Sequence, residues 1–228
     1  MNKIFSVYKP KGPTSNQMLN KIRGIVRTRQ QLTQLGGRSA KVGHAGTLDP
    51  LAQGVLVVGI GREATRQLGE VVKKEKEYIA KIKLGETSTT DDEEGVKLKV
   101  ESCKVIKLDD VEKILPKFVG KIMQVPPIYS AIKISGKEAY KRARKGENIK
   151  MQSREIEIKE IQILKYKWPY LKIKIVCGPG TYIRSLARDI GKELGVGGHL
   201  ADLERTRVGD FYKKNAVLED DLENFIKS

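Results

Sequence analysis

Asp49 is the first acidic residue in the sequence, and it lies in the glycine-rich segment GHAGTLDPLAQGVL, residues 43–56. A functional aspartate commonly binds a metal, forms half of a carboxylate pair, orients a histidine or acts at an electron-poor carbon. The next acid is Glu63, so this segment offers neither an oxygen cage nor a glycosidase pair, and the chain lacks a G-x-S-x-G turn. Two interpretations remain, namely chemistry at an electron-poor carbon and an Asp-Pro turn without chemistry.

The composition is strongly basic, with 44 Lys and Arg against 28 Asp and Glu and a formal net charge of +16. Such a charge is tolerated most easily when a polyanion neutralises it, which favours nucleic acid as the partner. The alternatives are a generally basic proteome and a ribosome-associated scaffold. A DNA-binding protein is disfavoured because the sequence shows no helix-turn-helix or zinc-finger pattern.

Metal and disulfide chemistry has little support in the sequence. Cys103 and Cys177 are too few for a disulfide framework and show no zinc spacing, and His44 and His199 are the only histidines. The N-terminus has no apolar run long enough for a signal peptide, and no later stretch is long enough to span a bilayer. We therefore expect a soluble cytoplasmic protein without membrane association.

The elements that must position Asp49 can be read from the apolar pattern. Residues 4–7 predict a short strand, and residues 54–61 form a continuous apolar run typical of a strand buried on both faces. Thr14 or Ser15 can cap a helix between them, whose buried stripe is Met18, Leu19, Ile22, Ile25 and Val26. The polar, acid-free stretch at 27–41 predicts an exposed loop that could lie on a phosphate backbone.

The middle of the chain alternates between helical and strand patterns. A helix is expected at 62–72, and a strand at 76–84 has alternating apolar positions, namely Tyr78, Ala80, Ile82 and Leu84. The acidic segment 86–95 is interpreted as a solvated hairpin tip. A helix at 109–119 follows, and then comes a segment at 129–145 in which two tyrosines are interspersed with lysines and arginines.

The last third predicts two strands within 153–177, a helix at 181–194 and a strand at 203–211. The helix has a buried stripe and a separate basic face; the stripe is Ile183, Leu186, Ile190 and Leu194, and the basic face is Arg184, Arg188 and Lys192. Strands and helices are interspersed without strict βαβ alternation. This order favours the α+β class with a mixed or antiparallel sheet.

The Asp49 segment resembles the signature of the TruB family of tRNA pseudouridine synthases, which isomerise the uridine at position 55 in the T-loop of tRNA. Further segments resemble the family in the right order, from about residue 4 to residue 211; they are YKPKGPTS, KEYIAKIKLG, QVPPIYSAIK, GTYIRSLARDIG and HLADLERTRVG. The resemblance covers nearly the whole chain. It implies an enzyme that breaks the N1–C1′ bond of uridine and rejoins the base through C5, without a cofactor.

The resemblance also implies roles for individual residues. Asp49 matches the catalytic carboxylate, and Arg184 matches the arginine that pairs with it and keeps it ionised. Tyr78 matches the tyrosine that stacks on the flipped base and takes part in proton removal. The remaining matches are substrate-binding positions: His44 helps to open the T-loop, Tyr182 and Leu203 line the pocket, and Lys9 and Arg66 are basic residues near it.

The fold implied is the pseudouridine-synthase fold, a mixed, largely antiparallel sheet with flanking helices and a central RNA-binding cleft. We expect residues 1–228 to form one catalytic domain that acts as a monomer, with a lobe at about 124–150 that grips the T-arm and no C-terminal PUA-type domain.

Where the family has Thr-Asp-Thr this chain has Ser88, Thr89 and Thr90, followed by the matching acid Asp92. The alternatives are a T-arm RNA chaperone with little catalysis and a synthase for other T-loop-like hairpins.

Overall fold

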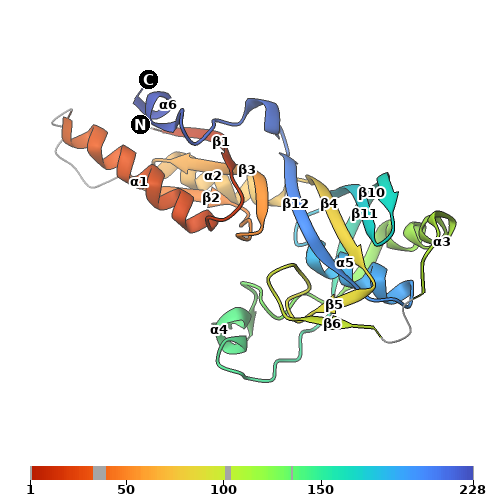
Figure 1. The fold of residues 1–228 in the computed structure, drawn as a ribbon. Coiled ribbons are helices and arrows are strands. Elements are labelled where there is room, and N and C mark those ends of the chain that lie inside the picture. The colour runs from red at the N-terminus through yellow and green to blue at the C-terminus, as the bar shows by residue number, and fades with distance from the viewer. Residues whose placement is uncertain (1, 33–39, 101–103, 135, 228) are drawn as a thin grey trace. The chain divides into compact units, whose positions relative to one another are not determined.

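The computed structural model describes residues 2–32, 40–100, 104–134 and 136–227. These residues fall into two compact units, one made of residues 1–78 and 204–228 and the other of residues 79–203. Two strands, β4 (Lys76–Leu84) and β12 (Gly198–Val208), contribute residues to both units. Most helices and strands of the two units are labelled in Figure 1.

The first unit is built on the strand β3 (Ala52–Ile60), which the apolar run predicted. Strand β1 (Lys3–Lys9) pairs antiparallel with β3, with Lys9 opposite Gly54 and Lys3 opposite Ile60. Strand β2 (Val42–Ala45) also pairs antiparallel with β3 and forms a hairpin with it. Nearly every side chain of β3 is buried, which confirms that the run is covered on both faces.

Helix α1 (Ser15–Leu32) covers one face of this sheet together with α6 (Leu222–Lys227). Its expected stripe is confirmed, and the core cluster that it joins is Phe5, Val7, Met18, Leu19, Ile22, Val26, Val42, Leu56, Val58, Ile60, Leu222 and Ile226. Thr14 caps the helix, because its Oγ1 accepts from the Gln17 N–H at 3.1 Å and its own N–H donates to Gln17 Oε1 at 2.7 Å.

The prediction of a loop at 27–41 is wrong for residues 27–32, because these residues continue α1. Arginine, glutamine and leucine are good helix formers, so a polar composition does not end a helix that has already begun. Residues 33–39 of that expected loop lie outside the described residues, and residues 40 and 41 belong to no helix or strand.

Helix α2 (Arg62–Lys73) covers the other face of the hairpin and confirms the expected helix. Leu68 joins a second core cluster with Ala45, Val55, Val57 and Val208. Glycine allows this close packing, because a Cβ at Gly59 would lie 3.1 Å from the Ala64 backbone. The short strand β13 (Phe211–Tyr212) pairs with the end of β12, and η2 (Lys213–Asn215) follows it.

The second unit has a sheet in the strand order β12–β4–β11–β10–β7. Strand β10 (Arg154–Lys167) pairs antiparallel with both β11 (Tyr170–Cys177) and β7 (Gly120–Gln124). The two strands expected within 153–177 are therefore confirmed, and β4 buries the alternating residues that the sequence indicated. Strand β12 begins at Gly198 rather than near 203, because residues 198–202 also take strand conformation in the sheet.

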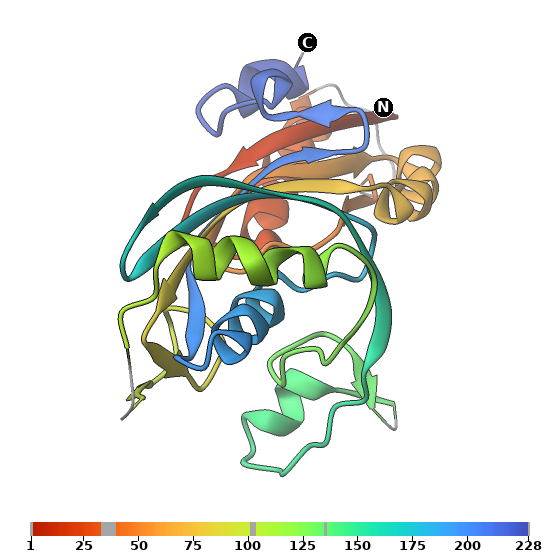
Figure 2. The ribbon, with the colours of Figure 1, turned by 90° about the vertical axis from the view of Figure 1, so that its right-hand side faces the viewer.

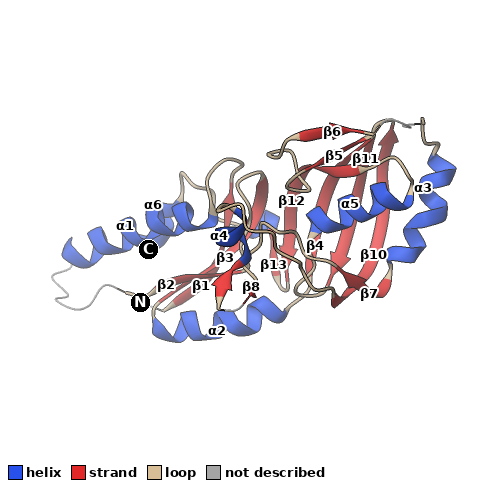
Figure 3. Cartoon of the chain, turned by 90° about the horizontal axis from the view of Figure 1, so that it is seen from below, coloured by secondary structure: helices blue, strands red, loops and turns tan. Residues whose placement is uncertain are grey.

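Helices α5 (Ile183–Glu193) and α3 (Leu108–Ile114) lie on the same face of this sheet (Figures 2 and 3). The stripe expected for α5 is buried as predicted. The helix expected at 109–119 ends as a 3₁₀ turn, η1 (Leu115–Phe118), because Pro116 has no N–H to continue the α-helical bonding.

Smaller elements complete the second unit. Strands β5 (Glu86–Ser88) and β6 (Lys97–Lys99) form one hairpin, and β8 (Lys133–Ile134) and β9 (Lys137–Glu138) form another. The short helix α4 (Ala139–Ala143) follows β9. Helices and antiparallel strand pairs in both units confirm the α+β class.

Candidate active site

Asp49 lies in the loop that joins β2 to β3. Gly46 begins the loop with a φ of 79°, a conformation that L side chains rarely adopt. The carbonyl oxygen of Asp49 accepts a hydrogen bond from the N–H of Ala52 at 3.1 Å, which closes a turn with Pro50 at its second position. The turn expected from the sequence is therefore present, and its acid is half-buried.

The connection between β1 and α1, together with the first residue of α1, holds the middle of the Asp49 loop. Ser15 Oγ donates to the carbonyl oxygen of Leu48 at 2.9 Å and accepts from the Leu48 N–H at 2.8 Å. The N–H of Gly12 donates to the carbonyl oxygen of Pro50 at 2.8 Å. Both sequence neighbours of Asp49 are therefore bonded to this connection.

Lys9, the last residue of β1, is completely buried directly before this connection. Its Nζ donates to the carbonyl oxygens of Pro10 at 2.8 Å and Pro13 at 2.7 Å. These bonds hold together the segment 10–13, which contains Gly12. The substrate contact expected for Lys9 stays a prediction.

Arg205, which the sequence motifs did not single out, bonds to both ends of the segment that carries Asp49. Its Nε donates to the carbonyl oxygen of Val55 at 2.8 Å, and its Nη2 donates to that of Gly46 at 2.9 Å. The strands approach closely here, because a Cβ at Gly54 would lie only 2.2 Å from the Arg205 carbonyl oxygen. Arg205 lies within the family-like segment HLADLERTRVG, but its polar neighbours Glu204 and Thr206 give no sign that it is buried.

His44 lies on β2, directly before the Asp49 loop. A Cβ at the preceding Gly43 would meet Leu68 of α2 at 3.2 Å, so His44 points to the opposite face of the strand. Burial lowers the pKa of His44, and the positive charges of Arg205 and Arg23 lower this pKa further. Its Nδ1 is buried without a hydrogen-bond partner among the described residues. The imidazole is therefore neutral at pH 7.

The other two candidates in this unit differ in their surroundings. Tyr78 is buried on β4, at the position where the strand pattern placed it. Arg66 is exposed on α2, which packs on the Gly43 face of β2 and not on the face where His44 lies. The structure thus does not bring Arg66 next to His44.

In the second unit, Arg184 lies in the first turn of α5 and is 7% exposed. Its Nη1 is 3.4 Å from Asp92 Oδ2, and its Nη2 donates to the carbonyl oxygen of Tyr129 at 2.9 Å. Asp92 Oδ1 accepts from the Thr90 hydroxyl at 2.5 Å and from the Glu94 N–H at 3.0 Å. A basic side chain in an amphipathic helix therefore belongs here to a buried polar network.

The interpretation of 86–95 as a solvated hairpin tip is wrong for its two aspartates. Asp92 is buried against Arg184, and Asp91 Oδ2 accepts from Arg188 Nη1 at 2.7 Å. Arg188 Nη2 also donates to the carbonyl oxygen of Val125 at 2.8 Å. Burial raises the pKa of Asp91, although the neighbouring Arg188 opposes this rise. Two arginines one turn apart on α5 therefore bind the acidic turn from one side.

Tyr182 precedes α5 and is held by a residue that sequence reasoning missed. The buried amide of Gln124 donates to the Tyr182 carbonyl oxygen at 3.1 Å and accepts from the Tyr182 N–H at 2.9 Å. This pair fixes the backbone that leads into α5. Leu203, the other predicted pocket residue of the unit, is buried on β12.

The basic segment within 124–150 carries its charge on α4 and the chain around it. Lys141 and Arg142 pair with Glu138 and Glu147 at 3.1 and 2.5 Å. The guanidinium of Arg144 lies 5.6 Å from the ring centroid of Tyr140. Its RNA-gripping role stays a prediction.

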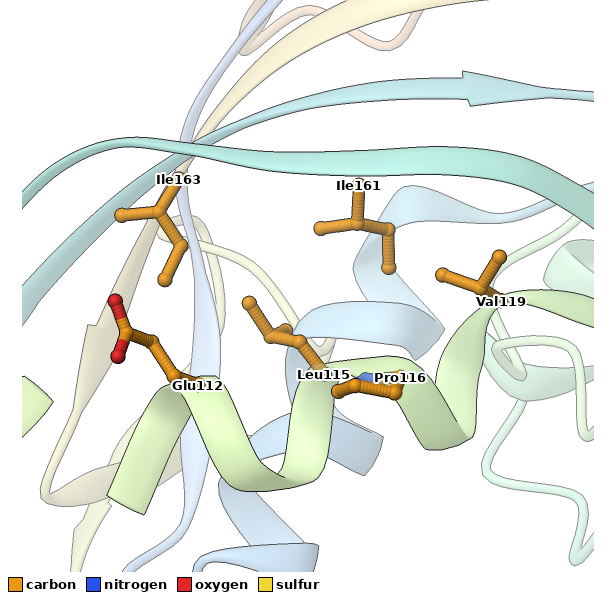
Figure 4. Close-up of a pocket in the computed structure, with 6 residues that line it drawn as sticks. All are labelled: Glu112, Leu115, Pro116, Val119, Ile161 and Ile163. Atoms are coloured by element: carbon orange, nitrogen blue, oxygen red, sulfur yellow. The ribbon is translucent and has the colours of Figure 1, made fainter. Parts of the chain in front are cut away.

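A groove of about 490 Å³ lies between α3 with η1 and strand β10 (Figure 4). Its lining is Glu112, Leu115, Pro116, Val119, Ile161 and Ile163, so it contains none of the predicted site residues. The described part of the chain contains no cluster of three or more His, Cys, Asp or Glu side chains that could hold a metal ion. No described helix is both long and apolar enough to cross a membrane.

Comparison with known families matches residues 33–183 to the family model described as TruB family pseudouridylate synthase (N terminal domain). Residues 184–228 match the model described as tRNA pseudouridylate synthase B C-terminal domain. The chain is 44% identical over 219 residues to a tRNA pseudouridine synthase B of Parabacteroides distasonis, covering 96% of this chain and 91% of the relative. It is 41% identical over 222 residues to the tRNA pseudouridine synthase B of Clostridium tetani, covering 97% of this chain and 73% of the relative.

Two solved structures are also similar. A chain in the crystal structure of a Cbf5-Nop10-Gar1 complex superposes with a TM-score of 0.73 at 28% identity, over 97% of this chain and 54% of that chain. A chain in the structure of an H/ACA RNP bound to a substrate RNA containing 2′-deoxyuridine superposes with a TM-score of 0.69 at 26% identity. This match covers 97% of the present chain and 52% of that chain. The present chain therefore spans about half the length of these two chains.

Proposed function

This chain belongs to the TruB family of pseudouridine synthases, and we propose that it isomerises uridine 55 in the T-loop of tRNA, with Asp49 as the catalytic carboxylate. The likeness to a chain of the Cbf5-Nop10-Gar1 complex confirms the fold that the motifs imply. The observation that carries the assignment of Asp49 is its place in a turn bonded on both sides to the rest of its unit. Such fixation suits a group that must meet one carbon atom of a substrate.

The reaction is an isomerisation, so all atoms of the uridine are retained, except for protons that exchange with solvent. The Asp49 carboxylate acts at C1′ while the N1–C1′ bond breaks, the uracil turns, and C5 forms the new bond to C1′. The proton on C5 is then lost to solvent, and N1 gains one. No hydrolytic water, electron carrier or metal is required by this balance.

The other predicted residues are assigned to charge and to base flipping. Arg184 supplies positive charge, and Tyr78 provides the surface on which the extruded uracil stacks, offsetting an unstacking cost of a few kcal/mol. Neutral His44 enters the T-loop, because a charge-free imidazole is removed from water at lower cost than an imidazolium. Tyr182 and Leu203 line the pocket in this proposal.

Binding of the T-arm is assigned to the basic lobe within 124–150, with Lys9 and Arg66 as further basic residues. The net charge of +16 supports an electrostatic contribution to RNA affinity. We assign the activity to a cytoplasmic monomer that uses no cofactor.

The test is tritium release from uridine labelled at C5, in a T-arm hairpin and in full-length tRNA. Wild-type protein should release tritium, and the Asp49→Asn variant should not. Tight RNA binding without release from either RNA would support an RNA chaperone instead. Release from T-loop-like hairpins of other RNAs, with none from tRNA, would move the assignment to another substrate.

A further inference from the structure

We infer that Arg205 and Ser15 are positioning residues for the reaction proposed above, because together they fix the backbone on which Asp49 stands. The catalytic role of Asp49 belongs to the proposed function, and this inference rests on it. Both residues lie in the same unit as Asp49, and the family resemblance implies a role for neither. Arg205 is 1% exposed and so is Ser15, so neither can be the group that touches RNA.

The Arg205 guanidinium closes the Asp49 segment at its two ends. Its Nε and Nη2 bond to the carbonyl oxygens of Val55 and Gly46, at 2.8 and 2.9 Å. A guanidinium is a rigid planar fork, so one side chain sets the separation of these two carbonyl groups. Residues 47–54, which include Asp49, lie between these two carbonyl groups. The two ends of this segment therefore cannot move independently of each other.

The burial of Arg205 is costly, which argues that it is more than a packing residue. A buried charge normally has a charged partner. Among the residues that the structure describes, no acidic side chain pairs with Arg205, and its bonds go to neutral carbonyl groups. An apolar residue could fill the same volume without this cost, but it could not bond both ends of the loop.

Ser15 fixes the centre of the loop. Its hydroxyl makes a reciprocal pair of hydrogen bonds with the N–H and carbonyl groups of Leu48, the residue immediately before Asp49. The backbone bond from Gly12 to Pro50 fixes the residue immediately after it. The Asp49 backbone thus has anchors on both sides, and the Arg205 fork holds the ends of the segment beyond them.

Loss of these anchors should slow the reaction, because a misplacement of a catalytic group by about 1 Å can lower the rate by about 100-fold. We propose to measure single-turnover tritium release and RNA affinity for Arg205→Lys and Ser15→Ala. Lysine keeps the positive charge but cannot bond both carbonyl groups as a planar fork. Each variant should lower the rate at saturating RNA by about 10- to 100-fold, with the Kd for the T-arm changed by less than about threefold.

The matched control is Val26→Ala, which removes core volume from α1 in the same unit without touching the loop. All rates are measured below the melting temperature of each variant and are referred to the folded fraction. Val26→Ala should lose stability and keep the wild-type rate. Equal rates for Arg205→Lys, Ser15→Ala and this control would overturn the positioning role, as would a Kd that rises in step with the loss of rate.

Hydrogen exchange of the free protein provides a readout that does not depend on activity. The Leu48 amide and its neighbours within 46–52 should exchange at least about tenfold faster in both variants, while amides in the centre of the β1–β3 pair keep their protection. Unchanged exchange at Leu48, or a uniform increase through β1 and β3, would contradict the inference. If Asp49→Asn were as active as wild type, the proposed role of Asp49 would fail, and this exchange pattern would still decide whether the loop is held as described.

Discussion

The guanidinium of Arg184 lies 3.4 Å from the carboxylate of Asp92, and both side chains are almost completely buried. The two residues come from α5 and from the acidic turn after β5. Asp92 also accepts hydrogen bonds from Thr90 and from the Glu94 N–H. One carboxylate therefore holds the turn together and compensates the charge of the arginine.

Replacing Asp92 by Asn should destabilise the protein by about 1–3 kcal/mol, because a buried arginine loses its charge partner while the amide keeps part of the hydrogen bonding. Urea denaturation would measure the change in the free energy of unfolding. The comparison is Asp109→Asn, an exposed acid on α3 of the same unit, which should leave the midpoint of unfolding close to that of wild type. A midpoint of Asp92→Asn equal to that of wild type would show that the pair contributes nothing to stability.

Replacing Asp49 by Asn should abolish tritium release and leave affinity for the T-arm within a few-fold of wild type, because the loop backbone is held by groups other than the carboxylate. Release under single-turnover conditions and fluorescence binding would measure the two effects separately. Asp210→Asn, an exposed acid in the same unit, provides the matched charge change. Residual release near the wild-type level would remove Asp49 from the mechanism.

The stability of the protein should fall as the pH drops below about 6.5, in part because of His44. Its pKa is lower in the folded protein than the ordinary value of 6.5, so below that value the unfolded chain takes up a proton that the folded protein does not. His44→Gln removes this titration, and the variant should lose less stability than wild type between about pH 7 and pH 5. Parallel stability curves from urea denaturation across that range would contradict the prediction.

RNA affinity should depend strongly on salt, and the basic lobe should account for part of that dependence. Each phosphate that the protein no longer neutralises lowers the slope of log K against log salt by about 0.7–0.9. Arg144→Gln with Lys145→Gln should therefore reduce the slope by more than Lys113→Gln with Lys117→Gln, an equal charge change on α3 and η1. Equal reductions for the two pairs would indicate that only the total charge matters.

Gly54→Ala should be strongly destabilising, by about 3 kcal/mol or more. Its φ is 110°, and a Cβ there would lie 2.2 Å from the Arg205 carbonyl oxygen. Gly69→Ala provides the opposite expectation, because Gly69 lies in α2 with open space around it and alanine favours a helix by about 0.5–1 kcal/mol. Thermal unfolding of both variants would test the contrast, and equal shifts would refute it.

The sequence by itself determined the family, the α+β class and most of the regular elements. Residues 54–61 are apolar without interruption, so the strand could be assigned to a two-sided core, and the stripes of α1 and α5 repeat at helical spacing. The Asp-Pro turn was also predictable, because Asp49 and Pro50 favour a turn through their own backbone preferences. These features depend on residues that are close together in the chain.

The tertiary structure decided which polar residues are buried and what they hold. Ser15 meets Leu48 across 33 positions of the chain, and Arg205 meets Val55 across 150. The acidic turn looked solvated because the arginines that bury it come from α5, about 90 residues later. The periodicity of a local sequence does not predict such contacts. A buried charge is stable only when a distant segment supplies its hydrogen-bond partners at the right distance.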